Sequence, residues 1–348
     1  MSVGIARLLL VAATLMLMNV PQSSALDAFW HGVRSSDWDH GIDPVTQQSN
    51  WYSQAPPNGV ATGVPDGEAV FAAGALRMAV EIKFKNEIGA MRFPANTPKY
   101  IISIFPDVQF TVTGAGVVNN STVVPQIRNS GRMIMTRQAK FVGNSARAAL
   151  VKNQSSLRFT GSSGGGNAEV SNESGTAQTV FFGTSSADSM LITNRATLGR
   201  TTTAFADRST GGSAELINEN SGSLEFDATT GPAGDGKVTA GRIRNAGSLV
   251  LGKNILTLSG AFNQRTSGQT HIIVRKPAQG RLVVNNIATL DGSLVVNGDT
   301  KLLAGRYVIL RAAGGRVGKF KTVTFNGFRP GPKPRLIYTP KQIVLSVP

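Results

Sequence analysis

Short stretches in which apolar and polar residues alternate recur along most of this chain. Val80–Phe84 and Val108–Val112 carry an apolar residue at every second position, and Ile101–Phe105 is a less regular example. Successive side chains of a β-strand point to opposite faces, so the alternation predicts short strands with one buried face. Helical periodicity is nearly absent, and Gly, Ser, Thr and Asn fill the gaps. The pattern therefore predicts an all-β chain of many short strands joined by turns.

A longer repeat organises the middle of the chain. Three segments begin with a phenylalanine, continue with small polar residues and glycine, and end on an apolar-x-Asn step. Their phenylalanines are Phe159, Phe182 and Phe205, which are 23 residues apart each time. A period of this length is typical of stacked units, none of which can bury its apolar face alone. We therefore predict that each period forms one coil of a solenoid.

The asparagine of this step recurs over a longer stretch, with gaps of 24, 19, 22, 24 and 27 residues. The residues concerned are Asn129, Asn153, Asn172, Asn194, Asn218 and Asn245. Asparagine tolerates the left-handed backbone of a tight corner, and its amide both donates and accepts hydrogen bonds. We predict a structural ladder of asparagines stacked on parallel strands about 4.8 Å apart. The alternative, scattered solvent-facing asparagines, leaves the repeat unexplained.

The N-terminal quarter divides into two regions. Residues 1–25 are predicted to be a signal peptide, because Arg7 precedes an apolar run, Leu8–Val20, and small residues follow it. That run is shorter than the roughly 20 residues that span a bilayer. Residues 26–100 hold all three tryptophans in turn-rich sequence, and we expect an aromatic N-terminal cap and the first strands there. Sugar binding by these aromatics is the alternative.

The remaining sequence divides into a repeat core and a closing region. Residues 101–260 are expected to form the parallel β-helix repeats, and residues 261–348 a basic C-terminal β cap. Asp291-Gly292 lies between two strand-like runs and predicts a β-hairpin in that cap. No segment after the signal peptide is apolar enough to cross a membrane. The chain has no cysteine, so burial and strand pairing must stabilise it without disulfides.

Charge is the most uneven property of the sequence. Residues 241–348 hold 17 Lys and Arg but 2 Asp and Glu, whereas residues 1–240 hold 18 of each, so the whole net charge of +15 lies in the last third. Such a region attracts polyanions by steering and counterion release. The candidate contact residues are Arg306, Arg311, Arg316, Lys319, Lys321, Arg329, Lys333 and Arg335. The alternative is that they keep exposed sheet edges from pairing with other chains.

Residues that would carry catalysis or hold a metal do not form a motif. The chain has three histidines, His31, His40 and His271, and none lies in a catalytic signature. The acidic residues near His40 do not follow the spacing of a calcium loop. The run Gly161–Gly166 superficially resembles a nucleophile loop, but it recurs in the next repeats and therefore reads as a turn. We expect no catalytic residue, no metal and no cofactor.

Several of these segments resemble one known family. They are the Trp-containing opening, the phenylalanine repeats, and the closing segments Gly305–Leu310 and Gly314–Phe320. Together they resemble the passenger region of bacterial autotransporters, which are secreted right-handed single-stranded parallel β-helices. The family continues into an outer-membrane barrel, and these 348 residues contain no such segment. Release, a separate outer-membrane exporter and a truncated relative are the alternatives.

The sequence thus predicts a non-catalytic β-helix that is secreted or surface-associated. Its expected role is that of an adhesin-like binding module that contacts lipopolysaccharide or acidic polysaccharide of host or bacterial surfaces through its basic third. We expect no specific nucleic-acid partner. The expected location is extracellular or on the cell surface, with the periplasm as the alternative. An enzyme acting on an acidic polysaccharide, or a remnant without a ligand, are the other two hypotheses.

Overall fold

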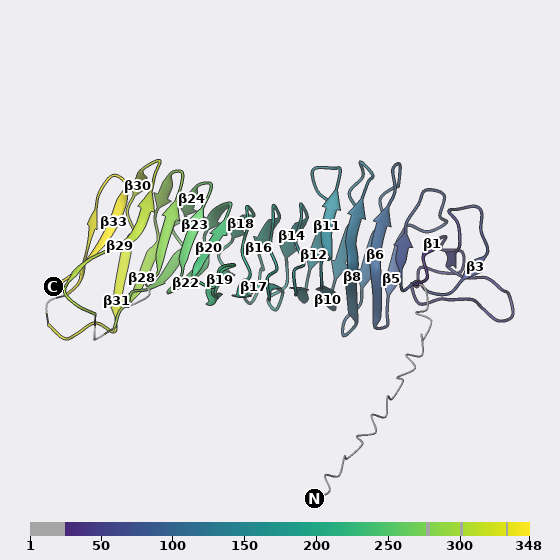
Figure 1. Ribbon diagram of the computed structural model, residues 1–348, viewed down its shortest axis with the longest axis horizontal. Helices are drawn as coiled ribbons and strands as arrows, with labels where there is room; N and C mark the ends of the chain where they lie inside the picture. Colours follow the sequence, from purple (N-terminus) through teal and green to yellow (C-terminus); the bar gives the residue numbers. More distant parts are fainter. Residues whose placement is uncertain (1–24, 276–278, 300–301, 332) are drawn as a thin grey trace, which may run out of the picture.

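The computed structural model describes residues 25–275, 279–299, 302–331 and 333–348. In this part of the chain all regular structure is β, without a helix, and parallel strands stack into a β-solenoid of about ten turns (Figure 1). The predicted fold class is therefore confirmed. The predicted signal peptide lies, except for Ala25, outside the described residues.

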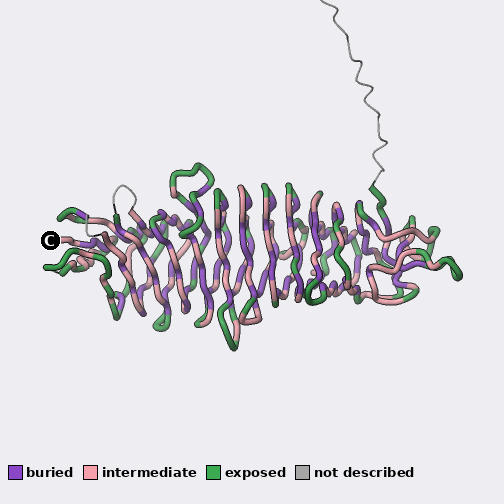
Figure 2. The backbone as a smooth tube through the Cα atoms, turned by 90° about the horizontal axis from the view of Figure 1, so that it is seen from below, coloured by how far each residue is buried: buried purple, intermediate pink, exposed green. Residues whose placement is uncertain are grey.

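Three sheets run along the solenoid, each built from strands of successive coils (Figure 1). Sheet A contains, in spatial order, β3 (Ala61–Thr62), β2 (Trp51–Tyr52), β1 (Ala28–Trp30), β4 (Glu68–Val70), β6 (Asn86–Phe93), β8 (Gln109–Asn119), β10 (Arg132–Met135), β13 (Ser156–Phe159), β15 (Gln178–Phe181), β17 (Thr201–Asp207), β19 (Gly222–Thr229), β22 (Ser248–Gly252), β25 (Gln269–Ile273), β28 (Ser293–Asn297) and β31 (Thr322–Asn326), with β11 (Lys140–Gly143) paired to β8. Figure 2 shows the coils side by side, with buried residues recurring at corresponding places.

Two further sheets complete the solenoid. Sheet B contains β5 (Ala79–Ile82), β7 (Ile101–Ile104), β9 (Gln126–Asn129), β12 (Leu150–Asn153), β14 (Glu169–Asn172), β16 (Leu191–Asn194), β18 (Glu215–Asn218), β21 (Arg242–Asn245), β24 (Phe262–Gln264), β27 (Ala288–Leu290) and β30 (Arg316–Gly318). Sheet C contains β20 (Lys237–Ala240), β23 (Ile255–Leu258), β26 (Arg281–Val284), β29 (Gly305–Ala312), β33 (Gln342–Val347) and β32 (Arg335–Tyr338).

The glycine- and serine-rich runs form a third side of the coil in the middle of the molecule. There, beyond β11, successive coils meet through single parallel bridges from Lys140 to Gly164, from Gly164 to Ser186, and from Ser186 to Thr210. The chain passes so close to its neighbour that a Cβ on Gly166, whose φ is +54°, would lie 1.5 Å from the Phe141 carbonyl oxygen. A turn is therefore the role of the Gly161–Gly166 run.

A column of stacked phenylalanines fills the centre of four coils. The rings of Phe159, Phe181, Phe205 and Phe226 are fully buried and follow one another at centroid distances of 4.6, 4.9 and 4.7 Å, within 9° of parallel. Phe182, which the sequence repeat aligns with Phe159 and Phe205, is not part of this column, so that alignment is wrong. Phe181 pairs in register with Phe159 and with Phe205. These coils are 22 and 24 residues long, so the equal spacing of 23 in the sequence picked the neighbouring, half-buried residue.

The six asparagines lie at matching register positions of sheet B, and each amide Nδ2 donates to the Oδ1 of the next. The five distances from Asn129 to Asn245 are 2.8, 2.7, 2.7, 3.3 and 2.8 Å. All six side chains are buried. Each Nδ2 also donates to a backbone carbonyl of sheet A, for example Asn129 to Ser156 at 2.8 Å. The ladder therefore joins both successive coils and two sheets.

The two ends of the ladder differ. At the N-terminal end Ile104 occupies the equivalent position of the preceding coil, and the buried Oδ1 of Asn129 has no hydrogen-bond partner. At the other end Asn245 donates to Oε1 of Gln264 at 3.4 Å. Gln264 continues the ladder with the same amide chemistry one methylene further from the backbone. Because it is not an asparagine, the repeat in the sequence does not reveal it.

An aromatic cluster closes the N-terminal end of the solenoid. Strands β1, β2 and β3 pair antiparallel, and β1 joins β4 in parallel. Trp30, Trp38 and Trp51 are fully buried there, with centroids 5.1 Å apart for Trp30 and Trp51 and 4.7 Å apart for Trp38 and Trp51. Such edge-to-face pairs add to the hydrophobic effect. Because the indole rings are buried, they offer no face on which a sugar could stack.

At the C-terminal end, β29 and β32 both pair antiparallel with β33. The predicted hairpin at Asp291-Gly292 is wrong, because the strands on either side belong to different sheets: β27 pairs with β24 and β30, and β28 pairs with β25 and β31. Asp291-Gly292 is a corner of the coil. Gly292 has a φ of +62°, and a Cβ there would lie 2.2 Å from the Gly268 carbonyl oxygen of the preceding corner.

Truncation of neighbouring phenylalanines separates the true stack from its apparent repeat. We expect Phe181→Ala to lower the free energy of unfolding by about 3–5 kcal/mol, because it leaves a cavity between two stacked rings. Phe182→Ala should cost about 1 kcal/mol or less, because that ring is half-buried. Urea midpoints followed by circular dichroism measure both. Equal losses would contradict the assignment of the stack.

Replacing an asparagine in the middle of the ladder should lower the stability of the protein more than replacing the first one. Asn194→Leu leaves four groups without their partner, namely the Asn172 amide, the Thr203 hydroxyl, the Asn218 oxygen and the Ser223 carbonyl. Asn129→Leu leaves two, the Asn153 oxygen and the Ser156 carbonyl. At about 1–3 kcal/mol for each unsatisfied buried group, we expect Asn194→Leu to lower the urea midpoint roughly twice as much. A larger effect at Asn129 would refute this ordering.

Candidate anion-binding surfaces

The eight basic residues singled out in the C-terminal third do not form one patch. Arg306 and Arg311 lie on β29 of sheet C, and Arg335 lies on β32 of the same sheet. Arg316 begins β30 of sheet B, and Lys319 and Lys321 follow it before β31 of sheet A. Arg329 and Lys333 lie in the loop between β31 and β32. The residues therefore lie on sheets B and C and in the loops before and after β31, at the closing end of the solenoid.

Two small groups form within this set. Arg306 and Arg335 are both register partners of Ser346 on β33, from its two sides, so they flank one residue on the same face of sheet C. Arg316 and Lys319 both lie over the ring of Tyr338, at 5.0 and 5.5 Å from its centroid. Such cation–π contacts fix the side chains and leave their charges in place.

Most of these charges are exposed, and that of Lys321 is neutralised. All members of the set except Arg316 are in the exposed class. Lys321 forms an ion pair with Asp291, at 3.1 Å. The pKa of Asp291 is lowered mainly by the hydrogen bond from the Gly292 amide, then by that from Thr266, and then by the contact with Lys321. The strands β30, β31 and β32 are the terminal strands of their sheets. The basic residues thus also line the unpaired strand edges at this end.

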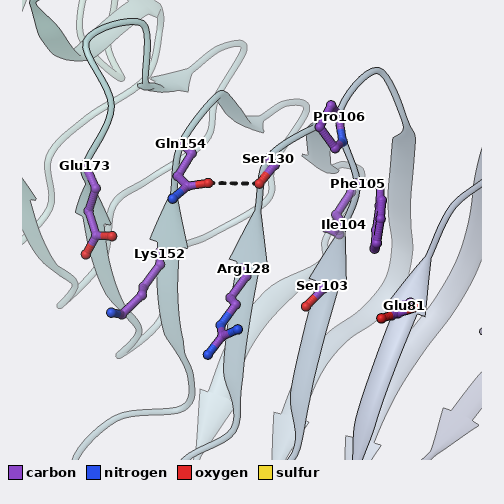
Figure 3. A pocket seen from close by; sticks show the side chains of 10 residues that line it. All are labelled: Glu81, Ser103, Ile104, Phe105, Pro106, Arg128, Ser130, Lys152, Gln154 and Glu173. Atoms are coloured by element: carbon purple, nitrogen blue, oxygen red, sulfur yellow. Dashed lines mark hydrogen bonds between the residues drawn. The ribbon is translucent and has the colours of Figure 1, made fainter. Parts of the chain in front are cut away.

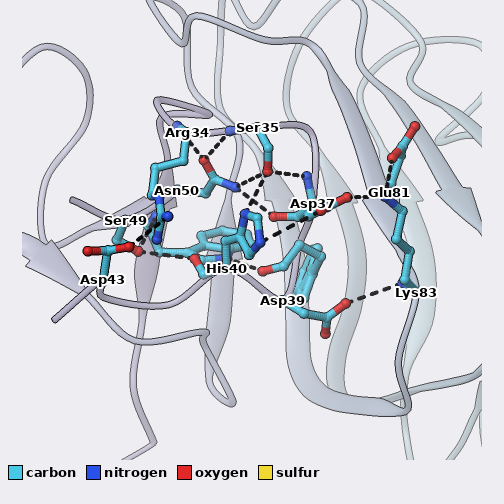
Figure 4. Close-up of polar contacts among 12 residues, drawn as sticks. Arg34, Ser35, Asp37, Asp39, His40, Asp43, Ser49, Asn50, Glu81 and Lys83 are labelled. Carbon is cyan, nitrogen blue, oxygen red and sulfur yellow. Dashed lines mark hydrogen bonds and ion pairs between the residues drawn. The ribbon is translucent and has the colours of Figure 1, made fainter. Parts of the chain in front are cut away.

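A second polar group lies in the N-terminal cap (Figure 4). Its centre is Asn50, which is fully buried and whose Oδ1 accepts from the backbone amides of Arg34 and Ser35 at 2.9 and 3.1 Å. Its Nδ2 donates to the Asp37 carbonyl at 2.7 Å. Lys83 pairs with Asp37 and, at 2.9 Å, with Glu81, and its hydrogen bond lowers the pKa of Asp37. These contacts tie the cap to β5.

This group contains a serine, a histidine and an aspartate that sequence reasoning did not connect. The Oγ of Ser35 lies 2.8 Å from Nδ1 of His40, whose Nε2 lies 3.8 Å from Asp37. However, Ser35 Oγ also accepts from the Asp37 amide at 3.0 Å and from Asn50 Nδ2 at 3.2 Å. With both lone pairs engaged, this oxygen holds a turn and is poorly placed to attack a substrate.

The acidic residues of the cap act in turns and backbone contacts. Asp43 Oδ1 accepts from the backbone amides of Val45 and Thr46 at 2.9 and 2.8 Å, and Asp66 accepts from that of Leu26 at 2.6 Å. Burial raises the pKa of Asp39. Across the described ranges, no group of three or more His, Cys, Asp or Glu side chains could hold a metal ion.

A groove on sheet B is a feature that the sequence did not suggest (Figure 3). It has a volume of about 460 Å³ and spans successive strands β5, β7, β9 and β12. Its floor carries outward-facing residues in register: Glu81, Ser103, Arg128 and Lys152. Figure 3 shows Arg128 and Lys152 side by side, and Ser130 donating to Gln154 at 2.9 Å at the strand ends. No contiguous motif marks this site, because its lining residues come from five successive coils.

Comparison with known proteins does not assign the chain to a class. No family model matches the sequence, and no curated protein is significantly similar to it. The fold and the surfaces define it as a parallel β-solenoid with basic outward-facing residues. A search of the described residues for a helix long and apolar enough to cross a membrane finds none.

The cap should weaken in mild acid because of His31. This side chain is 5% exposed, stacks on Tyr52 at 4.2 Å, and places Nε2 2.7 Å from the Gln54 carbonyl. Burial lowers the pKa of His31 below its ordinary 6.5. The unfolded chain therefore takes up the proton first, and stability is lost as pH falls from about 6.5 towards the folded pKa. We expect His31→Phe to reduce the fall in urea midpoint between about pH 7.5 and pH 5. An unchanged fall would exclude His31 as its source.

Proposed function

We propose that the protein is a non-catalytic, exported binding module that contacts polyanionic macromolecules through the exposed basic residues at the closing end of its solenoid. The observation that carries this proposal is the placement of the C-terminal charge. Seventeen basic and two acidic residues occupy positions 241–348, and seven of the eight candidate contact residues are exposed. Lipopolysaccharide and acidic polysaccharides of cell surfaces are the proposed partners.

The arrangement supports long-range attraction more than recognition of one compound. The basic side chains lie on two sheets and in the loops before and after β31, so no single rigid ligand meets them all. A long flexible polyanion can meet several of them in succession, and each neutralised charge releases counterions. Such binding is strongly weakened by salt and tolerates different polymers. The recognised chemistry is therefore a high density of negative charge.

Protection of strand edges is a second candidate role for the same residues. Arg316, Lys319, Lys321 and Arg335 lie on or beside β30, β31 and β32, the terminal strands of the three sheets. Charged residues on an open edge discourage pairing with another chain. The two roles differ in their consequence: loss of edge protection causes concentration-dependent association, whereas loss of polyanion contact leaves the protein monomeric.

An autotransporter-like origin and surface display are part of the proposal. The solenoid supports the passenger-like architecture, and an outer-membrane exporter is a proposed partner. The enzymatic alternative, cleavage of an acidic polysaccharide, requires carboxylates free to exchange protons. In the sheet B groove Glu81 is paired with Lys83 at 2.9 Å and Glu173 with Arg195 at 3.6 Å. We therefore favour binding over turnover.

Neutralising the C-terminal cations tests the proposed polyanion contact. The variant Arg306→Gln/Arg311→Gln/Lys333→Gln/Arg335→Gln should elute from a heparin column at clearly lower salt than the unmodified protein. Its slope of log affinity against log salt should be shallower by up to roughly 0.9 for each lost contact. The matched control, Lys85→Gln/Lys99→Gln/Arg137→Gln/Lys253→Gln, removes the same charge from exposed positions elsewhere. Equal shifts in the two variants would show that only net charge matters and would overturn the proposal.

A further inference from the structure

The sheet B groove continues around a corner of the solenoid. A second groove, with a volume of about 420 Å³, lies on the sheet A side of the same coils, and the two share Pro106 and Ser130 in their linings. Ser130 and Gly131 form the corner between β9 of sheet B and β10 of sheet A. The two grooves therefore meet at this corner, and together we call them the corner groove.

On its sheet B side, the corner groove holds two cations directly opposite each other. Arg128 on β9 and Lys152 on β12 are register partners on neighbouring parallel strands, which lie about 4.8 Å apart. Like charges placed opposite each other on adjacent strands are destabilising. Neither residue forms an ion pair within the described ranges, and the nearby Glu81 and Glu173 are paired with other cations. The pair thus bears an unrelieved repulsion that a bound anion would remove.

The sheet A side also carries two cations, but they are offset along the strands, because Arg132 pairs in register with Ser156 and Arg158 pairs with Ile134. Arg132 on β10 and Arg158 on β13 line it, together with the carboxylate of Asp107. Arg158 Nε donates to Ser156 Oγ at 3.3 Å, and its guanidinium lies 5.8 Å from the centroid of Phe182. No described carboxylate forms a salt bridge with either arginine. Four cations from two successive coils therefore face the corner groove, two on each side of the corner.

The rest of the lining matches a sugar better than a nucleobase. Hydroxyl and amide side chains from both sheets supply hydrogen-bond donors and acceptors: Ser103, Gln109, Ser130, Gln154, Ser155 and Gln178. The ring of Phe105, which is 38% exposed, offers one apolar surface at the sheet B end. Proteins that bind single-stranded nucleic acids stack successive bases on several aromatic rings. One ring among many hydroxyl and amide groups suits a chain of sugars instead.

We propose that the corner groove is a binding site for a short stretch of acidic polysaccharide. Arg128 and Lys152 would hold one acidic group of the polymer, Arg132 and Arg158 another, and the serine and glutamine side chains would bond the sugar hydroxyls between them. Charge-assisted hydrogen bonds to carboxylate or sulfate are stronger than neutral ones. This site shares no residue with the C-terminal basic set, so it can be tested independently of the polyanion contact proposed above.

Calorimetric titration of the full chain with an oligogalacturonate of about six sugars tests the site, with a heparin-derived hexasaccharide as the sulfated counterpart. We expect Arg128→Gln/Lys152→Gln to weaken the binding of at least one of them about tenfold or more. Ser130→Phe should weaken it as well without changing charge, because it fills the corner. The control Lys85→Gln/Lys99→Gln removes two exposed charges outside the groove and should leave the affinity within about twofold.

Several results would overturn the proposal. They are no measurable binding of either acidic oligosaccharide, equal binding of a neutral dextran oligomer, or equal weakening by the control pair. Tighter binding of a single-stranded DNA hexamer with the same dependence on Arg128 and Lys152 would assign the groove to nucleic acid instead. Urea midpoints of all variants verify folding, and outward-facing substitutions on sheet B should leave them nearly unchanged. Binding that is weakened in the C-terminal quadruple variant but unchanged in Arg128→Gln/Lys152→Gln would also overturn the proposal.

Discussion

Parallel, in-register stacking of the coils is the constraint on which the rest of this molecule depends. In the parallel part of the sheets each strand hydrogen-bonds to the equivalent strand of the neighbouring coil. Side chains at the same register position therefore lie on one another, except at the register shifts of the pairs β6–β8, β17–β19 and β22–β25. A residue that points into the coil must therefore pack well against a residue of the same type in the next coil. Phenylalanine meets this condition by ring stacking and asparagine by amide hydrogen bonds. The ladder of amides is the polar counterpart of the aromatic column.

The same constraint acts differently on the outward face. Stacking brings like charges together wherever a basic residue recurs at one register position, and most outward rows avoid this by alternating with neutral or acidic residues. In sheet B, for example, Glu215 lies opposite Arg242 and forms an ion pair with it. Arg128 opposite Lys152 breaks that rule. A local exception without internal compensation is a feature that function explains better than stability does.

Sequence reasoning identified what depends on repetition within the chain. The spacing of the asparagines was enough to predict parallel coils, because the register of the ladder is also the register of the strands. It misplaced Phe182 because the coils have unequal lengths, and only pairing shows which of two adjacent phenylalanines points inward. It misread Asp291-Gly292 because a corner between two sheets and a hairpin turn require the same residues. The sequence could not reveal the corner groove, since its residues come from five coils and become neighbours only after stacking.

The architecture also bears on why a binding role suits this chain. Aromatic, aliphatic and amide stacks fill the interior, and the grooves on sheets A and B lie open on the outer faces. Catalysis gains most from charges held in a site that excludes water. The polar side chains on the outer face of a solenoid, in contrast, remain in contact with water. A repeating outer face instead presents similar groups at intervals of one coil. A polymer with regularly repeated acidic groups can use that periodicity by binding several coils at once, since each added contact is intramolecular.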